Sequence, residues 1–338
     1  MELKVLGRSD LKKVLDMRSV VEGVKTVYGL KAKGDTEVWP LVAYEFAKQE
    51  AVMDIRSGAV LGSEQLHGLK MLNNFPHNRE KGIPVFTGML MVFDSETGLP
   101  LGVMDASYIT GMRTGAAGAV GASVLARKDS TVLTVLGAGR QAMFQIAAVT
   151  VTMPNIKTVY IADELDKENE KNFAGLCREN LKTQFGIDAA DVAFLPAGSL
   201  AEAVAASDVV ITVTPSRKPV IMKEWVKPGT HFSCIGADME GKEEIDPEIF
   251  RNAKVFADDK EQCIRVGEME IPVKSGVISR DDIRGEIGQV ITGQIEGRTN
   301  DDEITVFDAT GLALLDLVTG KKALDGAWEK DIGLTADI

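Results

Sequence analysis

The stretch Ser130–Gln145, STVLTVLGAGRQAMFQ, is typical of an apolar strand, a glycine turn and the start of a helix. Its turn, GAGRQA at 137–142, matches the pattern G-x-G-x-x-G/A of dinucleotide-binding domains. In this pattern Gly137 makes the tight turn, Gly139 lets the backbone approach a pyrophosphate, and the small Ala142 lets the helix pack on its strand. The pyrophosphate would lie at the helix N-terminus, where free amides and the helix dipole favour an anion.

The glycine pattern alone could also be a plain turn between a strand and a helix, so the residues after it matter. A second apolar run, TVYIAD, ends in Asp163, where an acidic side chain can accept hydrogen bonds from ribose hydroxyls. A carboxylate there would repel a 2′-phosphate, which predicts NAD rather than NADP as the cofactor. Asp163 could also cap the helix that follows, and one residue could do both.

Apolar runs and helical patterns alternate after residue 128, with THFSCIG, AKVFADD and EITVFDATG as further strands. This alternation predicts an α/β fold, a Rossmann doubly wound parallel sheet, over 129–312. Residues 1–128 are predicted to form a smaller α+β domain. It would contain an amphipathic helix at about 9–33, extended runs, and a hairpin at the turn SETG. The helical run LALLDLVTGKKAL, within 313–338, is expected to return to it.

The composition of the chain limits the kinds of partner that it is expected to bind. The 338 residues carry 50 acidic and 38 basic side chains, a net charge of −12, so neither nucleic acid nor a membrane surface is expected to bind. The sequence has no run of 18 uninterrupted apolar residues, so no membrane-spanning helix is expected. The three cysteines and three histidines have no disulfide or metal-ligand spacing, so no metal is expected. We expect a cytoplasmic protein that binds small molecules.

Three charged residues outside the glycine turn are candidates for chemistry. Lys70 lies in the apolar run HGLKMLNNFPHN, where an unpaired ammonium is costly; the alternative is a lysine that extends to water from an edge strand. Arg113 could bind a carboxylate in a bidentate fork, or form a buried structural ion pair. Asp238 follows a predicted strand, at the end where α/β sheets bind ligands. The alternative for Asp238 is helix capping, for which Asp246 is better placed.

These residue types suit hydride transfer at the α-carbon of an amino acid. That reaction needs a cation for the substrate carboxylate and a group that exchanges the proton of the amine or imine. Arg113 and Lys70 supply the cations, and Asp238 supplies the acid or base. Lys70 would stay charged and stabilise a keto or carbinolamine oxygen as negative charge develops on it.

The chain resembles the ornithine cyclodeaminase/μ-crystallin family, and within it the archaeal-type alanine dehydrogenases. The resemblance covers nearly the whole chain in blocks such as GLKMLNNFPHNREKGIP, TGLPLGVMDASYITGMRTGAAG, TVTPSRKPVIMKEWVKPGTHFSCIGAD, GKEEID and ITVFDATGLALLD. It implies a homodimer in which the first domain, residues 1–128 with 313–338, supplies substrate binding and dimerisation. It also implies the catalytic pair Lys70 and Asp238, and Arg113 as a substrate-binding residue. It also implies a cofactor site of Thr114, Gly137, Gly139, Arg140, Gln141, Asp163, Thr214, Ile235 and Lys242.

The chain departs from the cyclodeaminases of this family at two positions. Leu41 stands where those enzymes carry an arginine, and Val85 stands where they carry a threonine. Arg56 could replace the missing carboxylate contact, with a solvated loop arginine as the alternative. Ala309 stands where relatives often have serine, so one hydrogen bond to the cofactor is expected to be absent.

Three functions therefore stay open. The first is an NAD-dependent oxidoreductase of small L-α-amino or imino acids, similar to alanine dehydrogenase or to an imine or ketimine reductase. The second is an ornithine cyclodeaminase, which reduces and reoxidises NAD within one turnover and releases ammonia; Leu41 and Val85 disfavour it. The third is a non-catalytic binding protein similar to μ-crystallin. The presence of Lys70, Arg113 and Asp238 together favours an enzyme.

Overall fold

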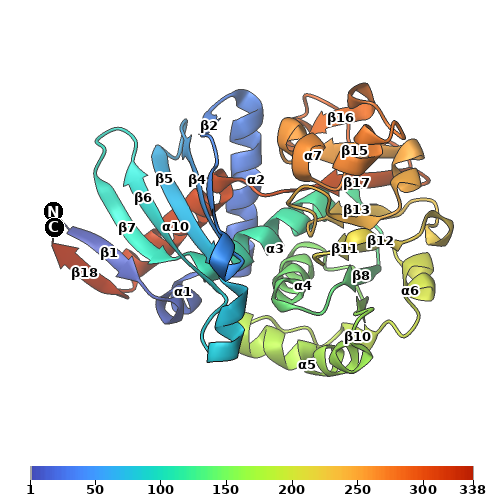
Figure 1. The fold of residues 1–338 in the computed structure, drawn as a ribbon, viewed down its shortest axis with the longest axis horizontal. Coiled ribbons are helices and arrows are strands. Elements are labelled where there is room, and N and C mark those ends of the chain that lie inside the picture. Colours follow the sequence, from blue (N-terminus) through green and yellow to red (C-terminus); the bar gives the residue numbers. More distant parts are fainter. Residues whose placement is uncertain (1, 338) are drawn as a thin grey trace. The chain divides into compact units, whose positions relative to one another are not determined.

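The computed structural model describes residues 2–337. The chain forms two compact units, Met1–Arg113 with Leu312–Ile338 (unit 1) and Thr114–Gly311 (unit 2) (Figure 1). The first boundary between the units falls inside helix α3 (Ala106–Leu125), and the boundary expected after residue 128 lies beyond the end of this helix. The second falls directly before α10 (Ala313–Glu329).

Unit 1 is built on one sheet in the strand order β18-β1-β7-β6-β5-β4-β2, with β3 also paired to β4. All of its pairings are antiparallel except the one between β1 and β7. The expected hairpin at SETG is confirmed between β6 and β7. The outer strands β1 and β18 were not predicted. The strands are β1 (Glu2–Leu6), β2 (Thr36–Val38), β3 (Val42–Phe46), β4 (Ala51–Val60), β5 (Leu66–Asn74), β6 (Phe86–Asp94), β7 (Pro100–Asp105) and β18 (Leu334–Asp337).

The single helix expected at about 9–33 is wrong, because the chain forms α1 (Arg8–Val14) and then α2 (Met17–Lys33). Leu15 is extended and ends α1. Asp16 then starts α2 as its N-cap, since its Oδ1 accepts a hydrogen bond from the Ser19 amide at 2.9 Å. Two short 3-10 helices, η1 (Ala47–Gln49) and η2 (Pro76–Lys81), complete unit 1.

Helix α10 packs on one face of the unit 1 sheet (Figure 1). Glycine on the strands lets the helix come close. A Cβ added to Gly68 of β5 would collide with Leu317 of α10, and one added to Gly58 of β4 would contact Leu314 at 3.2 Å. The backbone of α10 is therefore held firmly against β4 and β5.

Unit 2 has the predicted doubly wound sheet, in the order β10-β9-β8-β11-β13-β17-β15-β16, and every neighbouring pair is parallel. The chain order reverses between β8 and β11, which is where such sheets bind ligands. The strands are β8 (Val132–Leu136), β9 (Thr158–Ala162), β10 (Ala193–Pro196), β11 (Val209–Thr212), β13 (His231–Cys234), β15 (Ala253–Ala257), β16 (Ile283–Glu286) and β17 (Ile304–Asp308), with β12 (Arg217–Ile221) and β14 (Glu243–Ile245) in a small separate sheet.

The helices of unit 2 connect these strands, and α3 contributes its glycine-rich second half. A Cβ added to Gly118 would collide with Gln145 of α4, and one added to Gly121 would collide with the ring of Phe307 on β17. The glycines of α3 therefore allow it to pack closely against α4 and β17. The other helices are α4 (Arg140–Thr152), α5 (Lys167–Phe185), α6 (Leu200–Ala206), η3 (Lys223–Trp225), η4 (Pro247–Asn252), α7 (Lys260–Val266), α8 (Glu270–Lys274), η5 (Arg280–Asp282) and α9 (Ile287–Ile291). Within residues 2–337, no helix is long and apolar enough to cross a membrane.

Candidate active site

A buried carboxylate in unit 1, Asp316 of α10, binds two cations at once. Its Oδ2 accepts a hydrogen bond from Lys70 Nζ at 2.7 Å, and its Oδ1 accepts one from Arg113 Nε at 3.1 Å. The side chains of Lys70 and Asp316 are fully buried, and Arg113 is nearly so. Three elements that are distant in the sequence, β5, α3 and α10, therefore meet at one charged centre.

Strand alternation directs Lys70 toward α10. In β5 the residues Leu66, Gly68, Lys70 and Leu72 are buried and alternate with more exposed neighbours. On the adjacent strand β4, Arg56 stands opposite Lys70 in the register, and its Nε lies 3.8 Å from Asp54 Oδ2.

We call Lys70, Arg113, Asp316, Arg56 and Asp54 together the Asp316 cluster. With all five groups ionised it holds three cations and two carboxylates, so one positive charge is in excess. Such an excess suits one bound carboxylate.

Burial controls the ionisation of the central pair. Desolvation lowers the pKa of Lys70 to about 7; Asp316 opposes this shift, while Arg113 and Arg56 add to it. Burial by itself would raise the pKa of Asp316, but Arg113 and Lys70 outweigh it and hold that pKa below its ordinary value. Asp316 is therefore a permanent anion near neutral pH, whereas Lys70 can change its charge there.

The structure decides between some of the alternatives for these residues. The alternative of an edge-strand lysine is wrong for Lys70, because β5 lies between β4 and β6 and the side chain is buried. Arg113 does form the buried ion pair, yet this bond uses Nε and leaves the two terminal nitrogens outside it. Arg56 lies within strand β4, so the alternative of a loop arginine is wrong.

In unit 2 the glycine turn has the geometry that a bound pyrophosphate needs. Gly137 has a φ of 114°, a left-handed conformation that favours glycine, and a Cβ there would lie 3.3 Å from Thr214 Cγ2. Gly139 is the N-cap of α4, and a Cβ on it would meet no other described atom within 4 Å. Arg140 and Gln141 are the first two residues of α4. The turn is thus open on the side where a phosphate would approach.

Asp163 follows β9 and is tied to the same turn. The side-chain Nδ2 of Asn169 donates hydrogen bonds to Asp163 Oδ2 at 2.8 Å and to the carbonyl of Ala138 at 3.2 Å. Burial would raise the pKa of Asp163, but the hydrogen bonds from Asn169 and from nearby amides hold it below its ordinary value. The alternative role of Asp163 as a helix cap is wrong, because Asp166 caps α5.

Asp238 lies four residues beyond β13, in the turn that follows this central strand. Its Oδ1 accepts a hydrogen bond from Lys242 Nζ at 2.6 Å, and Lys242 also donates to the carbonyl of Gly236 at 3.3 Å. The side chain of Asp238 is 42% exposed. It does not cap the helix that follows; as expected, Asp246 caps η4.

Glu244 organises this turn and was missed from the sequence. Its carboxylate accepts a hydrogen bond from the Thr214 amide at 2.6 Å and another from the Gly236 amide at 3.0 Å. It thereby connects the segment after β11 with the segment after β13, which contains Ile235. Burial raises the pKa of Glu244 to about 7. The only signal was the pair of acidic residues in GKEEID.

The remaining predicted residues are placed as follows. The carbonyl of Thr114 accepts a hydrogen bond from Gln145 Nε2 at 3.0 Å, beside α4. Ala309 follows β17 and is buried. Leu41 is exposed, directly before β3. Asp316 was not predicted at all, although it is a lone acidic residue in the apolar run LALLDLVTG.

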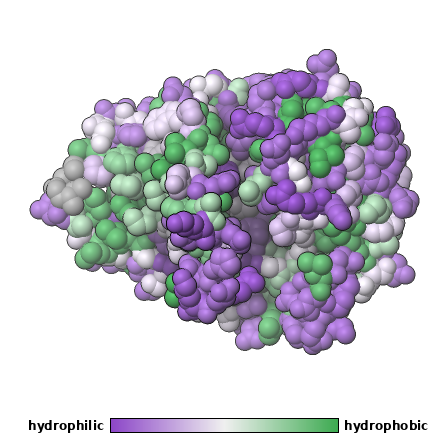
Figure 2. Space-filling model, viewed as in Figure 1, coloured by the Kyte–Doolittle hydropathy of each residue, from purple (hydrophilic) through white to green (hydrophobic). Residues whose placement is uncertain are grey.

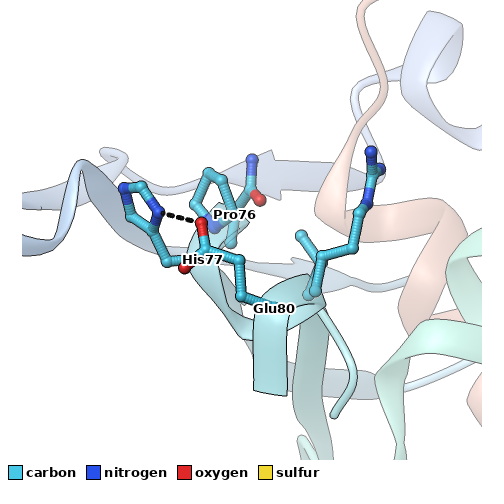
Figure 3. A pocket seen from close by; sticks show the side chains of 6 residues that line it. Pro76, His77 and Glu80 are labelled. Carbon is cyan, nitrogen blue, oxygen red and sulfur yellow. Dashed lines mark hydrogen bonds and ion pairs between the residues drawn. The ribbon is translucent and has the colours of Figure 1, made fainter. Parts of the chain in front are cut away.

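A separate pocket of unit 1 is lined by Asn74, Pro76, His77, Arg79, Glu80 and Val85. In this pocket His77 Nδ1 lies 3.0 Å from Glu80 Oε1 (Figure 3). Both side chains are largely exposed to solvent. The pocket contains Val85, but none of the residues predicted to act in binding or catalysis. Within residues 2–337, no group of three histidine, cysteine or acidic side chains could hold a metal ion.

Comparisons with known proteins show the family of the chain. The model of the ornithine cyclodeaminase/mu-crystallin family matches residues 1–331. An alanine dehydrogenase of Archaeoglobus fulgidus is 38% identical over 335 residues, 98% of each chain. A solved archaeal alanine dehydrogenase dimer with bound NAD has 37% identity and a TM-score of 0.90, with 100% of both chains covered. A Δ1-pyrroline-2-carboxylate reductase of Thermococcus litoralis, solved with NADH and L-proline, has 33% identity and a TM-score of 0.88, covering 99% of this chain and 100% of that chain.

Replacing Gly139 with alanine tests the glycine turn. The backbone of Gly139 is extended and the space for a Cβ is open, so alanine should leave the melting temperature close to that of the unmodified protein. The added methyl group would instead meet the phosphate, and NADH affinity should fall about tenfold or more, ~1.4 kcal/mol.

The matched control is Gly175→Ala, at an equally open and exposed position of α5. It should bind NADH as the unmodified protein does. Fluorescence titration with NADH and thermal unfolding measure both variants. Normal NADH affinity in Gly139→Ala would contradict this account of the turn.

Proposed function

Because the chain belongs to the ornithine cyclodeaminase/mu-crystallin family, we propose that it oxidises or reduces small amino or imino acids with NAD. It is an NAD-dependent oxidoreductase that transfers a hydride at the α-carbon of a small L-α-amino or imino acid. The observation that carries this function is the Asp316 cluster, since Lys70 and Arg113 share one buried carboxylate and leave one positive charge in excess. A monocarboxylate is the ligand that matches this charge.

In this proposal Arg113 binds the substrate carboxylate. Its Nε is held by Asp316, and its two terminal nitrogens lie outside that ion pair, in the planar arrangement that matches a carboxylate. Arg56 contributes further positive charge from the neighbouring strand, where it stands opposite Lys70. Lys70, the second cation in contact with Asp316, would also bind the substrate carboxylate and so orient the α-carbon.

Lys70 is proposed to stabilise negative charge on the reacting substrate. Its ammonium is buried, and electrostatic interactions are stronger in such surroundings than in water. It would donate a hydrogen bond to the keto or carbinolamine oxygen while it stays charged. Since burial lowers the pKa of Lys70 to about 7, its charged fraction in the free protein falls as the pH rises through that value.

Asp238 is the proposed acid or base that exchanges a proton with the amine or with the attacking water. Its partial exposure allows that exchange, and the ion pair with Lys242 holds its position. Lys70 and Asp238 would thus form the catalytic pair, one handling the oxygen and the other the proton.

The residues of unit 2 fit NAD, which supplies or accepts the hydride when it is bound. Gly137, Gly139 and the first amides of α4 would hold the pyrophosphate. The ionised Asp163 would accept hydrogen bonds from the ribose and disfavour a 2′-phosphate, so NAD is preferred over NADP. The other proposed cofactor contacts are Thr114, Arg140, Gln141, Thr214, Ile235 and Lys242.

A homodimer formed through unit 1 is also proposed. One row of apolar side chains crosses four strands on the sheet face away from α10, since Val42 pairs with Ile55, Ile55 with Met71, and Met71 with Met89. Val42, Met71 and Met89 are exposed. Contiguous exposed apolar side chains often mark a protein–protein interface. Figure 2 shows hydrophobic residues gathered over the strands of unit 1. A dimer is known for the archaeal alanine dehydrogenase relative. The cytoplasmic location stays a prediction.

A cyclic imine is the second candidate substrate. It is favoured by the relative from Thermococcus litoralis, a Δ1-pyrroline-2-carboxylate reductase. An imine of this kind carries one carboxylate, which the excess charge of the Asp316 cluster would also fit. Ornithine cyclisation is disfavoured by Leu41 and Val85, at positions where cyclodeaminases of the family differ.

Loss of NADH absorbance tests the function. With pyruvate and ammonium together the purified protein should oxidise NADH, because the imino acid formed from them presents one carboxylate to the Asp316 cluster. Pyruvate alone should give no reaction. Reaction only with Δ1-pyrroline-2-carboxylate would assign the protein to the cyclic imines instead. NADH binding without turnover of either substrate would contradict the proposal, and ammonia release from ornithine without net NADH change would establish the cyclodeaminase.

Replacing Lys70 with alanine tests its catalytic role. Turnover should fall by a factor of about 100 or more, because the charge that stabilises the developing oxyanion is lost. NADH affinity should stay nearly unchanged, since the glycine turn belongs to unit 2. The control is Lys25→Ala, an exposed lysine of α2, which should alter neither quantity. Equal losses of NADH affinity and turnover in Lys70→Ala would show that the substitution acts on the fold.

A further inference from the structure

We propose that Asp316 is a positioning residue that holds Lys70 and Arg113 at a fixed spacing so that both can bind one substrate carboxylate. This inference rests on the proposed function, in which the two cations bind the substrate. Asp316 itself would not bind the substrate carboxylate, because two carboxylates repel each other and its oxygens accept hydrogen bonds from Lys70 and Arg113.

The geometry gives each cation its own oxygen. Lys70 Nζ binds Oδ2 and Arg113 Nε binds Oδ1, so the width of one carboxyl group sets the separation of the two donors. An ammonium on a long flexible stem has many rotamers, and a guanidinium edge can rotate. The shared carboxylate removes this freedom from both side chains before the substrate arrives, which reduces the entropic cost of binding.

The carboxylate is itself held by a rigid element. Asp316 lies in the first turn of α10, between Leu314 and Leu317, which pack on Gly58 and Gly68 of the sheet. Its neighbours in the helix are fully buried. The position of the two cations therefore depends on helix-to-sheet packing, which changes little with solvent or loop motion.

A purely structural role explains the charges poorly. Desolvation of a buried ion pair costs free energy, and apolar residues of similar size often give equal or greater stability. Here three cations, Lys70, Arg113 and Arg56, face two carboxylates, Asp316 and Asp54, so one positive charge is in excess. An uncompensated positive charge in buried surroundings is costly, and a bound anion would offset that cost.

Removal of the carboxylate charge has a consequence with a definite sign. The charged groups around Lys70 are Asp316 from α10, Arg113 from α3, and Arg56 and Asp54 from β4, and Asp316 is the carboxylate that accepts a hydrogen bond from the ammonium. In Asp316→Asn the two arginines remain. The pKa of Lys70 should then fall, so the ammonium loses its proton at a lower pH. The alkaline limb of the kcat/KM profile should shift to lower pH as well.

The test compares Asp316→Asn, Asp316→Glu and the control Asp325→Asn, an acid-to-amide change at an exposed position of the same helix. In Asp316→Asn we expect kcat/KM for the amination of pyruvate to fall about 100-fold, and its alkaline limb to move down by about one pH unit or more. NADH affinity should be unchanged, which shows that unit 2 is intact. Asp325→Asn should behave as the unmodified protein.

Asp316→Glu keeps the charge but displaces it by one methylene. Its alkaline limb should stay in place while KM for pyruvate rises about tenfold, since the spacing of the cations is altered. This variant decides the matter if Asp316→Asn fails to bind NADH. An unmoved limb in Asp316→Asn with an equal loss of activity at every pH, or an unchanged KM in Asp316→Glu, would overturn the proposal.

Calorimetric titration of pyruvate into the NADH complex separates this inference from the proposed function. If the unmodified protein turns over no keto acid or imine, the proposed function fails. The positioning role then predicts that pyruvate binds the unmodified protein about tenfold more tightly than Asp316→Asn or Asp316→Glu. Equal affinities would overturn the positioning role even where turnover is observed.

Discussion

The chemistry of unit 1 depends on one buried carboxylate shared by two cations. Asp316 lies out of contact with water, where an isolated charge would be costly, and the cations around it, Arg113 and Lys70 foremost, keep it ionised. The same burial weakens the hold of Lys70 on its proton. The three groups therefore form one unit with an unsatisfied positive charge, and a substrate carboxylate would complete it.

Unit 2 meets a different requirement with a different part of the chain. A dinucleotide presents phosphates and ribose hydroxyls, and backbone amides after β8, together with Asp163 after β9, are the groups that suit them. Buried Glu244 holds the segments after β11 and β13 by accepting hydrogen bonds from their amides. In both units a buried acid fixes the position of the groups that are proposed to bind the ligand.

The sequence predicted what depends on local pattern. The glycine turn, the parallel alternation after it and the candidates Lys70 and Arg113 are all visible in short runs of residues. Asp316 and Glu244 were missed because their partners lie far away in the sequence: Asp316 meets Lys70 across 246 positions, and Glu244 meets Thr214 across 30. The break at Leu15 and Asp16 was missed because the apolar spacing continues through it, so only the cap geometry separates α1 from α2. Strands β1 and β18 pair with each other although they are far apart in the sequence, and no short run of residues indicates such a pairing.

The ionisation of Lys70 is the most direct test of this account. The protein can be labelled isotopically at the Cε carbons of lysine, and its NMR spectrum followed through pH, with Lys70→Arg to assign the signal. The account predicts one lysine that titrates at a pKa of about 7. Adding pyruvate to the NADH complex should raise that pKa, because a second carboxylate stabilises the ammonium. A Lys70 signal that titrates in the ordinary lysine range, or that ignores pyruvate, would contradict the claim that this buried cation binds the substrate.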